Sequence, residues 1–577
     1  MRRWLEKELE NPEDAQRLQD ELGLHPLIAR LLVLRGISEI EQAEDFLSPV
    51  LKKMPDPSLL KGMDLACERI TKAILDEERI VIYGDYDVDG VTSTTLLSLF
   101  LKELGVPATH LKYFIPNRVE HGYGLQEVCL PIVKEMGCDL LITVDCGITS
   151  RKEVAIAKEM GMETIILDHH LAPLELPEAC AILNPHQPDC PYPDKVLAAV
   201  GVTFNLVVGL RRYLRERDFF KGSQPALKKY LDIVALGTVA DIVPLLGVNR
   251  IFVQVGLQQM KQTQWLGLAA LMRVSELNFD KLSSYDLGFK LGPRINAAGR
   301  LRDASVGVEL LTTQDRVVAD RLAKELDKEN QARRDLEGNI QREAREIILQ
   351  SSIADGEEFP FAIVVARDTW HVGVVGIVAS RLVEEFHRPT VVIAVDKGIG
   401  KGSARSIPKF DLYESLKSCS SDLIGFGGHK AAAGLSIEID NISTFRKHFM
   451  DYAKQHITAE QLQPTLYLDM ELQPHELTDG LLEAIEELAP FGMSNPSPLF
   501  WGKQLQIIKQ RIVGSDGKHL QIEFALSQYE TIKAIAFGQA KNHPLPEFVD
   551  VAYLPQFNYW RNRRTIQLLI KKIYLPN

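Results

Sequence analysis

RIVIYGDYDVDG, residues 79–90, joins a short apolar run to three aspartates at alternate positions. The run 80–82 predicts a strand that is buried on both faces. If the backbone stays extended through Asp85, Asp87 and Asp89, the three side chains point the same way and their carboxylates converge. Because like charges held so close repel one another, we expect a cation among them.

A calcium-binding loop of the D-x-D-x-D-G type is the alternative interpretation of these letters. Such a loop follows a helix and carries glutamate at its twelfth position. In this chain a strand is predicted before the aspartates, and the twelfth position is Leu96. Both departures disfavour the calcium loop.

Length and composition indicate a globular protein of several domains. The chain has 577 residues, of which 45% are hydrophobic and 25% charged, and about three or four domains are expected. Its net charge of −12 argues against a uniformly basic surface that coats nucleic acid, but not against local basic channels.

The cysteines and the N-terminus indicate where the protein works. The seven cysteines show no paired metal-binding spacing, which predicts reduced thiols. The sequence MRRWLEKELENPEDAQ has no apolar core of signal-peptide length, and no later run is long and apolar enough for a membrane span. We therefore expect a cytoplasmic protein without membrane contact.

Helices and short apolar strands alternate after a helical lead-in at residues 1–60. The predicted elements are helix 65–77, strand 79–83, helix 91–104, strand 139–144, helix 151–160 and strand 163–167. This alternation is typical of a doubly wound parallel sheet, whose ligands bind beyond the carboxyl ends of the strands.

Polar residues follow the predicted strands where that rule expects a site. Asp145 follows the second strand, and DHH, residues 168–170, follows the third. A fourth apolar segment, 230–245, carries Asp232 and Asp241. Asp241 lies in a break before a proline and is the site candidate, whereas Asp232 better fits a cap or an ion pair.

The chemistry of these side chains indicates a pair of divalent ions. Carboxylates with one or two imidazoles and no thiolate suit Mn²⁺ or Mg²⁺ better than zinc. The set exceeds the needs of one ion, and two ions about 3.5 to 4 Å apart, bridged by a carboxylate, are a standard arrangement for phosphoester hydrolysis. The predicted reaction is therefore phosphoester hydrolysis.

DYDVDG, TVDCG, DHH and VADIVPL together resemble the four motifs of the DHH phosphoesterase family. Further stretches resemble its RecJ family, the bacterial exonucleases that degrade single-stranded DNA from 5′ to 3′. These stretches are GPRINAAGR (292–300), GKGSARS (400–406), FGGHKAAAG (426–434), PFGMSNPSPLF (490–500) and, near the N-terminus, ARLLVLRGISEIEQAEDFLSP.

The resemblance implies the site residues. Its metal ligands would be Asp85, Asp87, Asp89, Asp145, His169 and Asp241. Asp145 would bridge the ions, and the catalytic side chains would be Asp145, His169 and His170. Whether His170 binds metal or supports the chemistry stays open. Many relatives begin the first motif with histidine, but this chain has aspartate, as RecJ proteins do.

Two segments of the first lobe are candidates for DNA contact. FIPNRVEHGYGL, residues 114–125, predicts a surface loop, in which the resemblance assigns Arg118 to a phosphate and Tyr123 to a base. In GPRINAAGRLRD, the guanidinium groups of Arg294, Arg300 and Arg302 can bind a backbone phosphate in bidentate geometry, and Asn296 of the same stretch is a further candidate. A solvated basic turn is the alternative.

Beyond residue 313 the pattern predicts a long solvated helix and then a second α/β lobe. In that lobe GKGSARS predicts an anion nest of backbone N–H groups with Ser403 and Arg405, although glycine-serine loops are most often plain turns. FGGHKAAAG allows close backbone approach around His429. By resemblance this is a DHHA1-type lobe, with the 5′ phosphate of the DNA against Ser403 and Arg405.

About five short strands after residue 463 predict a small barrel of the oligonucleotide-binding (OB) type. Its last hairpin, QFNYWRNRRTIQ, interleaves aromatic and basic residues, which suits stacking on unpaired bases. Trp560 and Arg561 are the candidates for DNA contact. Because aromatic residues in strands are more often core, we expect about one of the three rings to face the DNA.

The predicted fold is therefore α/β, with two α/β lobes joined by a long helix and a C-terminal OB-type barrel. The predicted domains are a helical lead-in (1–60), a DHH domain (61–315), a connecting helix (316–350), a DHHA1-type domain (351–460) and an OB domain (461–577).

The residues predict a metal-dependent phosphoesterase, and the resemblance implies an exonuclease that releases mononucleotides from the 5′ end of single-stranded DNA, in repair and recombination. By resemblance its partners are a single-strand-binding protein and a RecQ-type helicase, and a monomer is expected. One alternative is a small-molecule phosphoesterase, although such relatives are typically shorter. The other is a non-catalytic scaffold, although scaffolds lose ligands and every expected position is filled here.

Overall fold

The strand 79–83 of the sequence lies inside a parallel sheet. β2 (Ile80–Gly84) pairs with β3 (Leu111–Phe114) on one side and β4 (Leu140–Val144) on the other, and β5 (Glu163–Leu167) and β6 (Ala181–Leu183) follow β4. Every residue of β2 and β4 is buried, as expected for strands covered on both faces. The predicted parallel sheet is confirmed, with two further short strands, β3 and β6.

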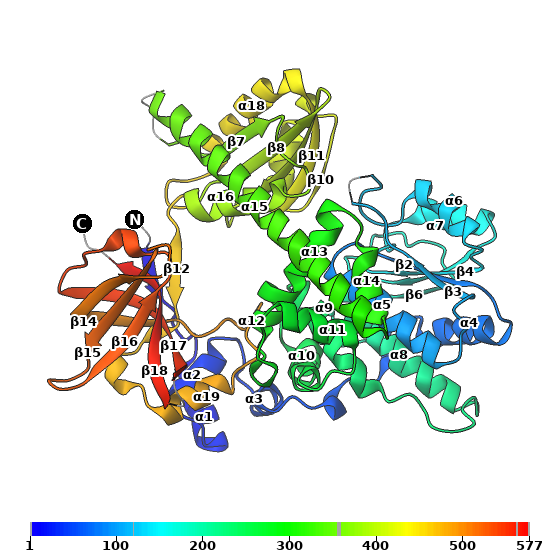
Figure 1. Ribbon diagram of the computed structural model, residues 1–577, viewed down its shortest axis with the longest axis horizontal. Coiled ribbons are helices and arrows are strands. Elements are labelled where there is room, and N and C mark those ends of the chain that lie inside the picture. The colour runs from blue at the N-terminus through cyan, green and yellow to red at the C-terminus, as the bar shows by residue number, and fades with distance from the viewer. Residues whose placement is uncertain (1–2, 119, 355–358, 561–562, 575–577) are drawn as a thin grey trace. The chain divides into compact units, whose positions relative to one another are not determined.

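Helices cover both faces of this sheet (Figure 1). α6 (Leu130–Glu135) and α7 (Arg151–Glu159) share an apolar cluster with one face, through side chains such as Val133 and Val154. α4 (Met63–Leu75), α5 (Val88–Glu103) and α8 (Ala199–Arg215) lie on the other side. The carboxyl ends of the strands are left open between these layers, and the predicted site lies at that edge.

This computed structural model describes residues 3–118, 120–354, 359–560 and 563–574, with 351–354 and 560 described by their backbone alone. The chain forms two units. The first contains Pro55–Asp241 and Gly256–Pro464, and the second contains the N-terminal segment up to Met54, Ile242–Val255 and the chain from Thr465. The remaining helices between the two predicted lobes are α9 (Leu231–Ala240), α10 (Gly247–Met260), α11 (Leu266–Val274), α12 (Ser284–Asp286), α13 (Gly292–Leu301) and α14 (Ser305–Thr312).

The connecting helix is α15 (Arg316–Ala354), a single helix of 39 residues. Its second half contributes Ile340, Ala344 and Ile348 to the core of the second lobe. In its middle, however, a stripe of polar residues is buried, and Arg333 donates hydrogen bonds to Glu337 at 2.9 Å and Asn330 at 3.1 Å. The expectation of a wholly solvated helix is therefore wrong for this stripe.

A mixed sheet forms the second lobe. Its strands, in the order β10-β11-β9-β8-β7, are β10 (Gly425–Gly428), β11 (Ala432–Glu438), β9 (Ile399–Arg405), β8 (Thr390–Asp396) and β7 (Ile363–Arg367). α16 (Val375–Phe386) covers one face, and α17 (Leu412–Ser418) and α18 (Ile442–His456) share the core of the other. This arrangement confirms the predicted second α/β lobe.

The predicted anion nest in GKGSARS is wrong, because this stretch is strand β9. Its backbone pairs with β8 on one side and β11 on the other, so its N–H groups serve the sheet. The glycines have a packing role instead. A Cβ at Gly402 would lie 2.8 Å from a methyl group of Leu435, and one at Gly400 would lie 2.7 Å from a methyl group of Ile393.

The second unit contains a closed barrel, as predicted. Its ring runs β14 (Phe500–Val513), β15 (His519–Ala525), β16 (Thr531–Ala536), β18 (Arg563–Tyr574) and β17 (Phe548–Trp560), and β17 pairs back to β14. β13 (Met470–Glu471) extends β14, and α19 (Asp479–Glu486) lies beside the barrel. Full closure leaves no unpaired edge in the ring.

The N-terminal helices belong to the core of this barrel unit. Residues of α1 (Pro12–Leu22), α2 (Pro26–Val33) and α3 (Ile40–Leu47) form one apolar cluster with Phe500, Tyr553 and Leu568. β1 (Arg3–Glu6) also pairs in parallel with β12 (Thr465–Leu468). The lead-in is thus part of the second unit, and the predicted domain boundaries stay a proposal.

Arg250 ties together the three segments of the second unit. The residue is 1% exposed, and its guanidinium donates to the carbonyl oxygens of Phe46 at 2.7 Å, Leu488 at 3.1 Å and Ala489 at 2.7 Å. It also lies 3.7 Å from the centre of the Phe46 ring. Burial lowers the pKa of this guanidinium to about 9.

We expect Arg250→Met to destabilise the second unit by about 3 kcal/mol, because several buried carbonyls would lose their donor at once. Denaturant unfolding of the full chain, followed by the tryptophans of each unit, measures this loss. Arg388→Met is the matched control, since Arg388 binds the carbonyls of Pro360 and His387 in the first unit. It should move the other transition, and an equal effect of both variants on the second unit would contradict the assignment.

Candidate metal centre

The three aspartates of the first motif lie in a turn between a strand and a helix. β2 ends at Gly84 and α5 begins at Val88. Asp87 caps the helix, and its carboxylate accepts from the N–H groups of Asp89 at 2.9 Å and Gly90 at 3.1 Å. The expectation of an extended backbone through the three aspartates is therefore wrong, but the turn still brings them to one place.

Gly90 allows this turn to be tight. A Cβ at this position would lie 2.3 Å from the carbonyl oxygen of Asp85, so no larger residue fits without moving the backbone. The last residue of the motif therefore sets how closely the start of α5 approaches the end of β2.

All six predicted ligands gather at the carboxyl edge of the sheet. Three groups of side chains have ligand atoms within 4.8 Å of one another. Two consist of predicted ligands alone, namely Asp85, Asp87 and Asp145, and Asp89, His169 and Asp241, and the third joins Asp145 and His169 to His170. Nε2 of His169 lies 3.4 Å from Oδ1 of Asp145, 3.6 Å from Oδ2 of Asp241 and 3.9 Å from Oδ2 of Asp89. Asp145 therefore adjoins both groups, as a bridging ligand must.

Each ligand arrives by a different local structure. Asp145 follows β4 with φ of 63°, and its N–H donates to the carbonyl of Leu167 at 2.9 Å. Asp241 caps the C-terminus of helix α9, so the fourth apolar segment is a helix. Asp89 accepts from the N–H groups of Ala199 and Val200 at 2.6 and 2.9 Å, where α8 begins.

Burial and crowding dominate the electrostatics of the centre. Burial, and then the neighbouring carboxylates, raise the pKa of Asp89 to about 7 and that of Asp241 to about 9. The same two causes raise the pKa of Asp145 well above its ordinary value. Burial, with His170 nearby, lowers the pKa of His169 to about 4, so its imidazole is neutral and can offer a lone pair.

These residues fit divalent cations. Oδ1 of Asp85, Nε2 of His169 and Oδ2 of Asp241 are buried and have no hydrogen-bond partner in the described part of the chain. Unsatisfied buried acceptors are costly. One cation in the group of Asp85 and one in the group of His169 and Asp241 would satisfy all three atoms. The donor set, oxygen with imidazole, is the one that Mn²⁺ and Mg²⁺ accept.

Asp168 has a role that the sequence analysis did not assign. This buried carboxylate accepts from Nδ1 of His170 at 2.7 Å and from the N–H groups of His169 at 2.7 Å and Ile148 at 3.0 Å. Burial alone would lower the pKa of His170, but the hydrogen bond to Asp168 outweighs it and raises that pKa. Asp168 therefore orients His170. Its position directly after β5 was the feature of the sequence that could have identified it as a site residue.

Tyr123 of the loop 114–125 lies beside His170, a neighbour that the sequence analysis did not assign to it. Its hydroxyl is 3.2 Å from the ring nitrogens of His170 and donates to the carbonyl of Asp145 at 3.4 Å. The ring is 48% exposed. The loop thus brings a phenol to the edge of the metal centre.

Arg300 lies near three other guanidinium groups, of which Arg333 is paired with Glu337 at 2.9 Å. Burial, followed by the charges of Arg118, Arg333 and Arg405, lowers the pKa of Arg300 to about 10. Arg405 donates to Oγ of Ser403 at 3.0 Å, and Arg300 donates to the carbonyl of Gly373 at 3.2 Å. A cluster of this kind attracts a phosphate.

Among the other predicted DNA contacts, Arg294 already has partners within the protein, and the roles of Asn296 and His429 stay predictions. Arg294 is engaged by Asp327 at 2.9 Å and by the carbonyl of Lys290 at 2.7 Å. Asn296 lies on α13, and His429 is exposed in the turn between β10 and β11. In the barrel unit, the side chain of Trp560 and the whole of Arg561 lie outside the described residues.

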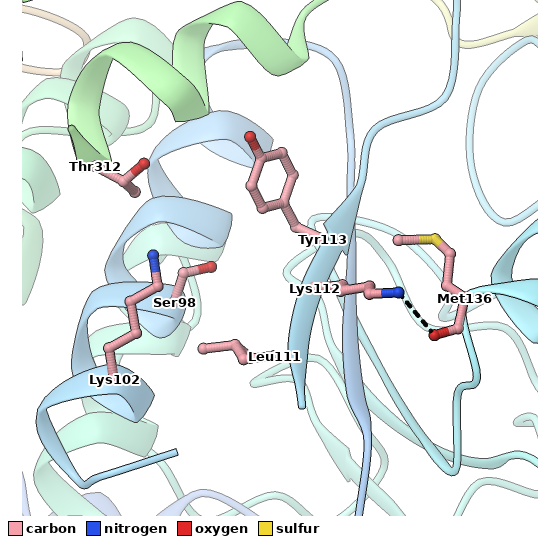
Figure 2. Close-up of a pocket in the computed structure, with 7 residues that line it drawn as sticks. All are labelled: Ser98, Lys102, Leu111, Lys112, Tyr113, Met136 and Thr312. Carbon is pink, nitrogen blue, oxygen red and sulfur yellow. Dashed lines mark hydrogen bonds between the residues drawn. The ribbon is translucent and has the colours of Figure 1, made fainter. Parts of the chain in front are cut away.

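A separate cavity of about 240 Å³ lies at the opposite end of α5 from Asp87 (Figure 2). Ser98 and Lys102 of α5, Tyr113 of β3 and Thr312 of α14 line it. It contains none of the predicted ligands. This cavity is therefore distinct from the metal centre.

Asp232 has a structural role, but its partners are neutral donors within the fold and not the helix cap or ion pair that the sequence analysis favoured. It is fully buried and accepts from Thr263 Oγ1 at 2.6 Å, Trp265 Nε1 at 3.0 Å and the N–H of Ile233 at 2.8 Å. Burial nevertheless outweighs these donors and raises its pKa from 3.8 to about 7.

Asp232→Asn should therefore change how stability depends on pH. Between the unfolded and folded pKa values the folded protein keeps a proton that the unfolded chain releases, so stability falls as pH rises from about 4 to about 7. The amide of the variant does not titrate and so does not lose stability in this way. Thermal unfolding across this pH range should show the melting temperature of the variant rising relative to that of the wild type as pH increases. Melting temperatures that change in parallel would contradict the raised pKa.

No described helix is long and apolar enough to cross a membrane. All seven cysteines are free thiols, six of them buried, in agreement with the prediction of reduced cysteines.

Three family models match separate parts of the chain. The N-terminal domain of the DHH family matches residues 79–238, the DHHA1 domain matches 359–455 and the RecJ OB domain matches 468–572. These ranges contain, in order, the parallel sheet, the mixed sheet and the closed barrel.

Whole proteins match as well. The chain is 40% identical to the single-stranded-DNA-specific exonuclease RecJ of Dickeya dadantii, over 96% of both chains. The crystal structure of RecJ from Thermus thermophilus in complex with Mn²⁺ matches all of this chain and 80% of its own, with a TM-score of 0.84 and 30% identity. The structure in complex with Mg²⁺ matches all of this chain and 79% of its own, with a TM-score of 0.77 and 28% identity. The chain therefore belongs to the RecJ family of single-stranded-DNA-specific exonucleases, within the DHH phosphoesterases.

Proposed function

We propose that this chain hydrolyses the phosphodiester bonds of single-stranded DNA from the 5′ end and releases mononucleotides, using two divalent ions, Mn²⁺ or Mg²⁺. The observation that carries the proposal is the pair of ligand groups that adjoin at Asp145 and hold buried, unsatisfied acceptor atoms. The complexes of the Thermus relative with Mn²⁺ and Mg²⁺ support the choice of ions.

Each ligand group would hold one ion, the first with Asp85, Asp87 and Asp145 and the second with Asp89, His169 and Asp241. When bound, such a pair supplies an activated water and stabilises the negative charge of the transition state. We assign no metal to His170. Its imidazole lies between Asp168 and the hydroxyl of Tyr123 at the edge of the centre, where it would serve the scissile phosphate as an acid–base group.

The guanidinium cluster would set the polarity. Arg118, Arg300 and Arg405, with Ser403, would bind the terminal 5′ phosphate, and guanidinium groups in a water-poor site bind phosphate strongly. A strand that ends in this phosphate would then place its first phosphodiester at the metal ions. The strand would have to be unpaired, because its bases as well as its phosphates must reach side chains of the protein. In a duplex the bases are occupied by pairing.

A labelling experiment tests the proposal. Single-stranded oligonucleotides labelled at the 5′ or the 3′ end are incubated with the full chain and Mn²⁺ or Mg²⁺, and products are followed with time. We expect labelled mononucleotide at once from the 5′ label, and from the 3′ label only after the strand is consumed. The reverse order, or internal cuts, would overturn the polarity.

The same assay separates the two alternatives. A small-molecule phosphoesterase would cleave dinucleotides but leave long strands intact, and a scaffold would bind the strands without any product. The RecJ OB match and the filled ligand positions speak against both.

The cellular role rests on the family resemblance. We propose a function in DNA repair and recombination in the cytoplasm, as a monomer, with a single-strand-binding protein and a RecQ-type helicase as partners. Co-purification with each partner, and light scattering of the isolated chain, test these points.

A further inference from the structure

Two aromatic side chains stand exposed beside the metal centre. Tyr285 is 61% and Phe289 63% exposed, and their rings stack with centroids 4.7 Å apart and planes at 23°. They lie four residues apart, on one face of α12 and the π-helical turn Leu287–Leu291 that follows it. Large aromatic rings left in water usually indicate a binding surface.

The segment itself is well anchored. Leu287 and Leu291, on its opposite face, are completely buried. Its start is fixed by a capping box, in which Ser283 and Asp286 bind each other. The aromatic pair is therefore held out by a rigid element, and π-helical turns of this kind often occur at functional sites.

The segment also contacts both helices that carry metal ligands. A Cβ at Gly288 would lie 3.4 Å from Val239, and one at Gly292 would lie 3.3 Å from Ala240 and 3.8 Å from Val88. Ala240 directly precedes Asp241, and Val88 lies between Asp87 and Asp89. The aromatic pair is thus about one to two helical turns from the centre.

The charges around the pair cancel. Nζ of Lys290 lies 2.8 Å from Asp286, and Arg294 is engaged by Asp327 at 2.9 Å. The surface therefore offers ring faces rather than a charge, and a ligand that binds by its flat face fits it better than a phosphate does. An unpaired nucleobase has this chemistry, and every base can stack.

We propose that Tyr285 and Phe289 form a base-stacking platform for the single-stranded substrate next to the metal centre. The inference rests on the proposed function, because it takes the occupant to be DNA. A base placed on the outer ring would extend the existing stack and hold the strand in line while the neighbouring phosphodiester is cut. Because stacking is independent of base identity, the platform would not select a sequence.

The test uses oligonucleotides that carry 2-aminopurine at successive positions from the 5′ end, bound to the full chain in EDTA so that nothing is cut. Fluorescence of this base is quenched when it stacks. In the wild type we expect strong quenching at one or two adjacent positions. The variant Tyr285→Leu with Phe289→Leu should lose that quenching and bind about tenfold more weakly, the loss expected for one to two stacked bases.

Leucine keeps the surface apolar but removes the rings. If the leucine variant retains wild-type affinity while the corresponding alanine variant loses it, the contact is merely apolar and the platform is overturned. Unchanged quenching in the leucine variant would overturn it too. Circular dichroism of each variant guards against misfolding, and the single variant Phe289→Trp, which keeps an aromatic ring at both positions, should retain both quenching and affinity.

Phe219→Leu with Phe220→Leu is the matched control. These rings form another aromatic pair of the same unit, 5.5 Å apart, beyond the end of α8. That helix begins beside Asp89 and has 17 residues, so its far end lies about 24 Å away. The control should bind and quench as the wild type does.

Wild-type hydrolysis of the same oligonucleotides in Mn²⁺ distinguishes a failure of the stacking platform from a failure of the proposed function. If the wild type cuts from the 5′ end but no position depends on Tyr285 and Phe289, only the platform fails. If the wild type neither binds nor cuts single strands, the proposed function itself fails.

Discussion

Asp145→Ala should lower kcat for single-stranded DNA by about 10⁴-fold or more, which corresponds to at least about 5.4 kcal/mol of transition-state stabilisation. Asp145 adjoins both ligand groups, so its removal weakens both metal sites at once. Single-turnover hydrolysis of a 5′-labelled oligonucleotide measures the loss. Binding of the same strand, followed by anisotropy in EDTA, should persist, because the guanidinium cluster is untouched.

Asp139→Ala is the control for this variant. Asp139 directly precedes β4, at the end of the strand opposite Asp145, and accepts from the N–H of Arg79 at 3.0 Å. Its loss removes a carboxylate from the same strand without touching the centre, so activity should stay near the wild type. A nearly active Asp145→Ala enzyme would refute the assignment of the metal site.

Asp168→Ala should lower kcat by about 10²-fold, the effect typical of losing a residue that orients a ligand or an acid–base group. The carboxylate accepts from the ring of His170 and from three backbone N–H groups. Without it the imidazole can rotate away from the centre. Steady-state kinetics on the same oligonucleotide, at saturating Mn²⁺, measures this change.

His170→Ala and the double variant complete a cycle for the second prediction. If Asp168 acts through His170, the double variant should be no slower than the slower single variant, since the two form one unit. Losses that add would show that Asp168 supports the centre independently, for example through the backbone of His169.

Local patterns predicted the sheet and the ligands well. The run 80–82 is a buried strand, and the rule that parallel strands deliver ligands at their carboxyl ends identified Asp145 and His169. The backbone path between Asp85 and Asp89 was not predictable in the same way. It depends on Gly90, whose lack of a side chain lets the helix start against Asp85, and alternate spacing alone cannot distinguish this turn from a strand.

The failed predictions concern contacts between distant segments. Glycines at 400 and 402 resemble a loop, but they make room for Ile393 and Leu435 in neighbouring strands. The charges at the middle of α15 suggested exposure, but Glu337 is engaged by Arg333 and by Arg381 of α16. Asp168 and Arg294 show the same limit at the site, since their roles are set by partners elsewhere in the chain.

The barrel unit combines segments that lie far apart in the sequence, and this imposes an order on biosynthesis. The helices before Met54 are made long before the strands that cover Leu31 and Ala43, which follow Thr465. The apolar face of the nascent N-terminal segment therefore stays uncovered while the first unit is synthesised. Ribosome-bound chaperones should engage this segment, and a chain released early by premature termination should be prone to aggregate through it.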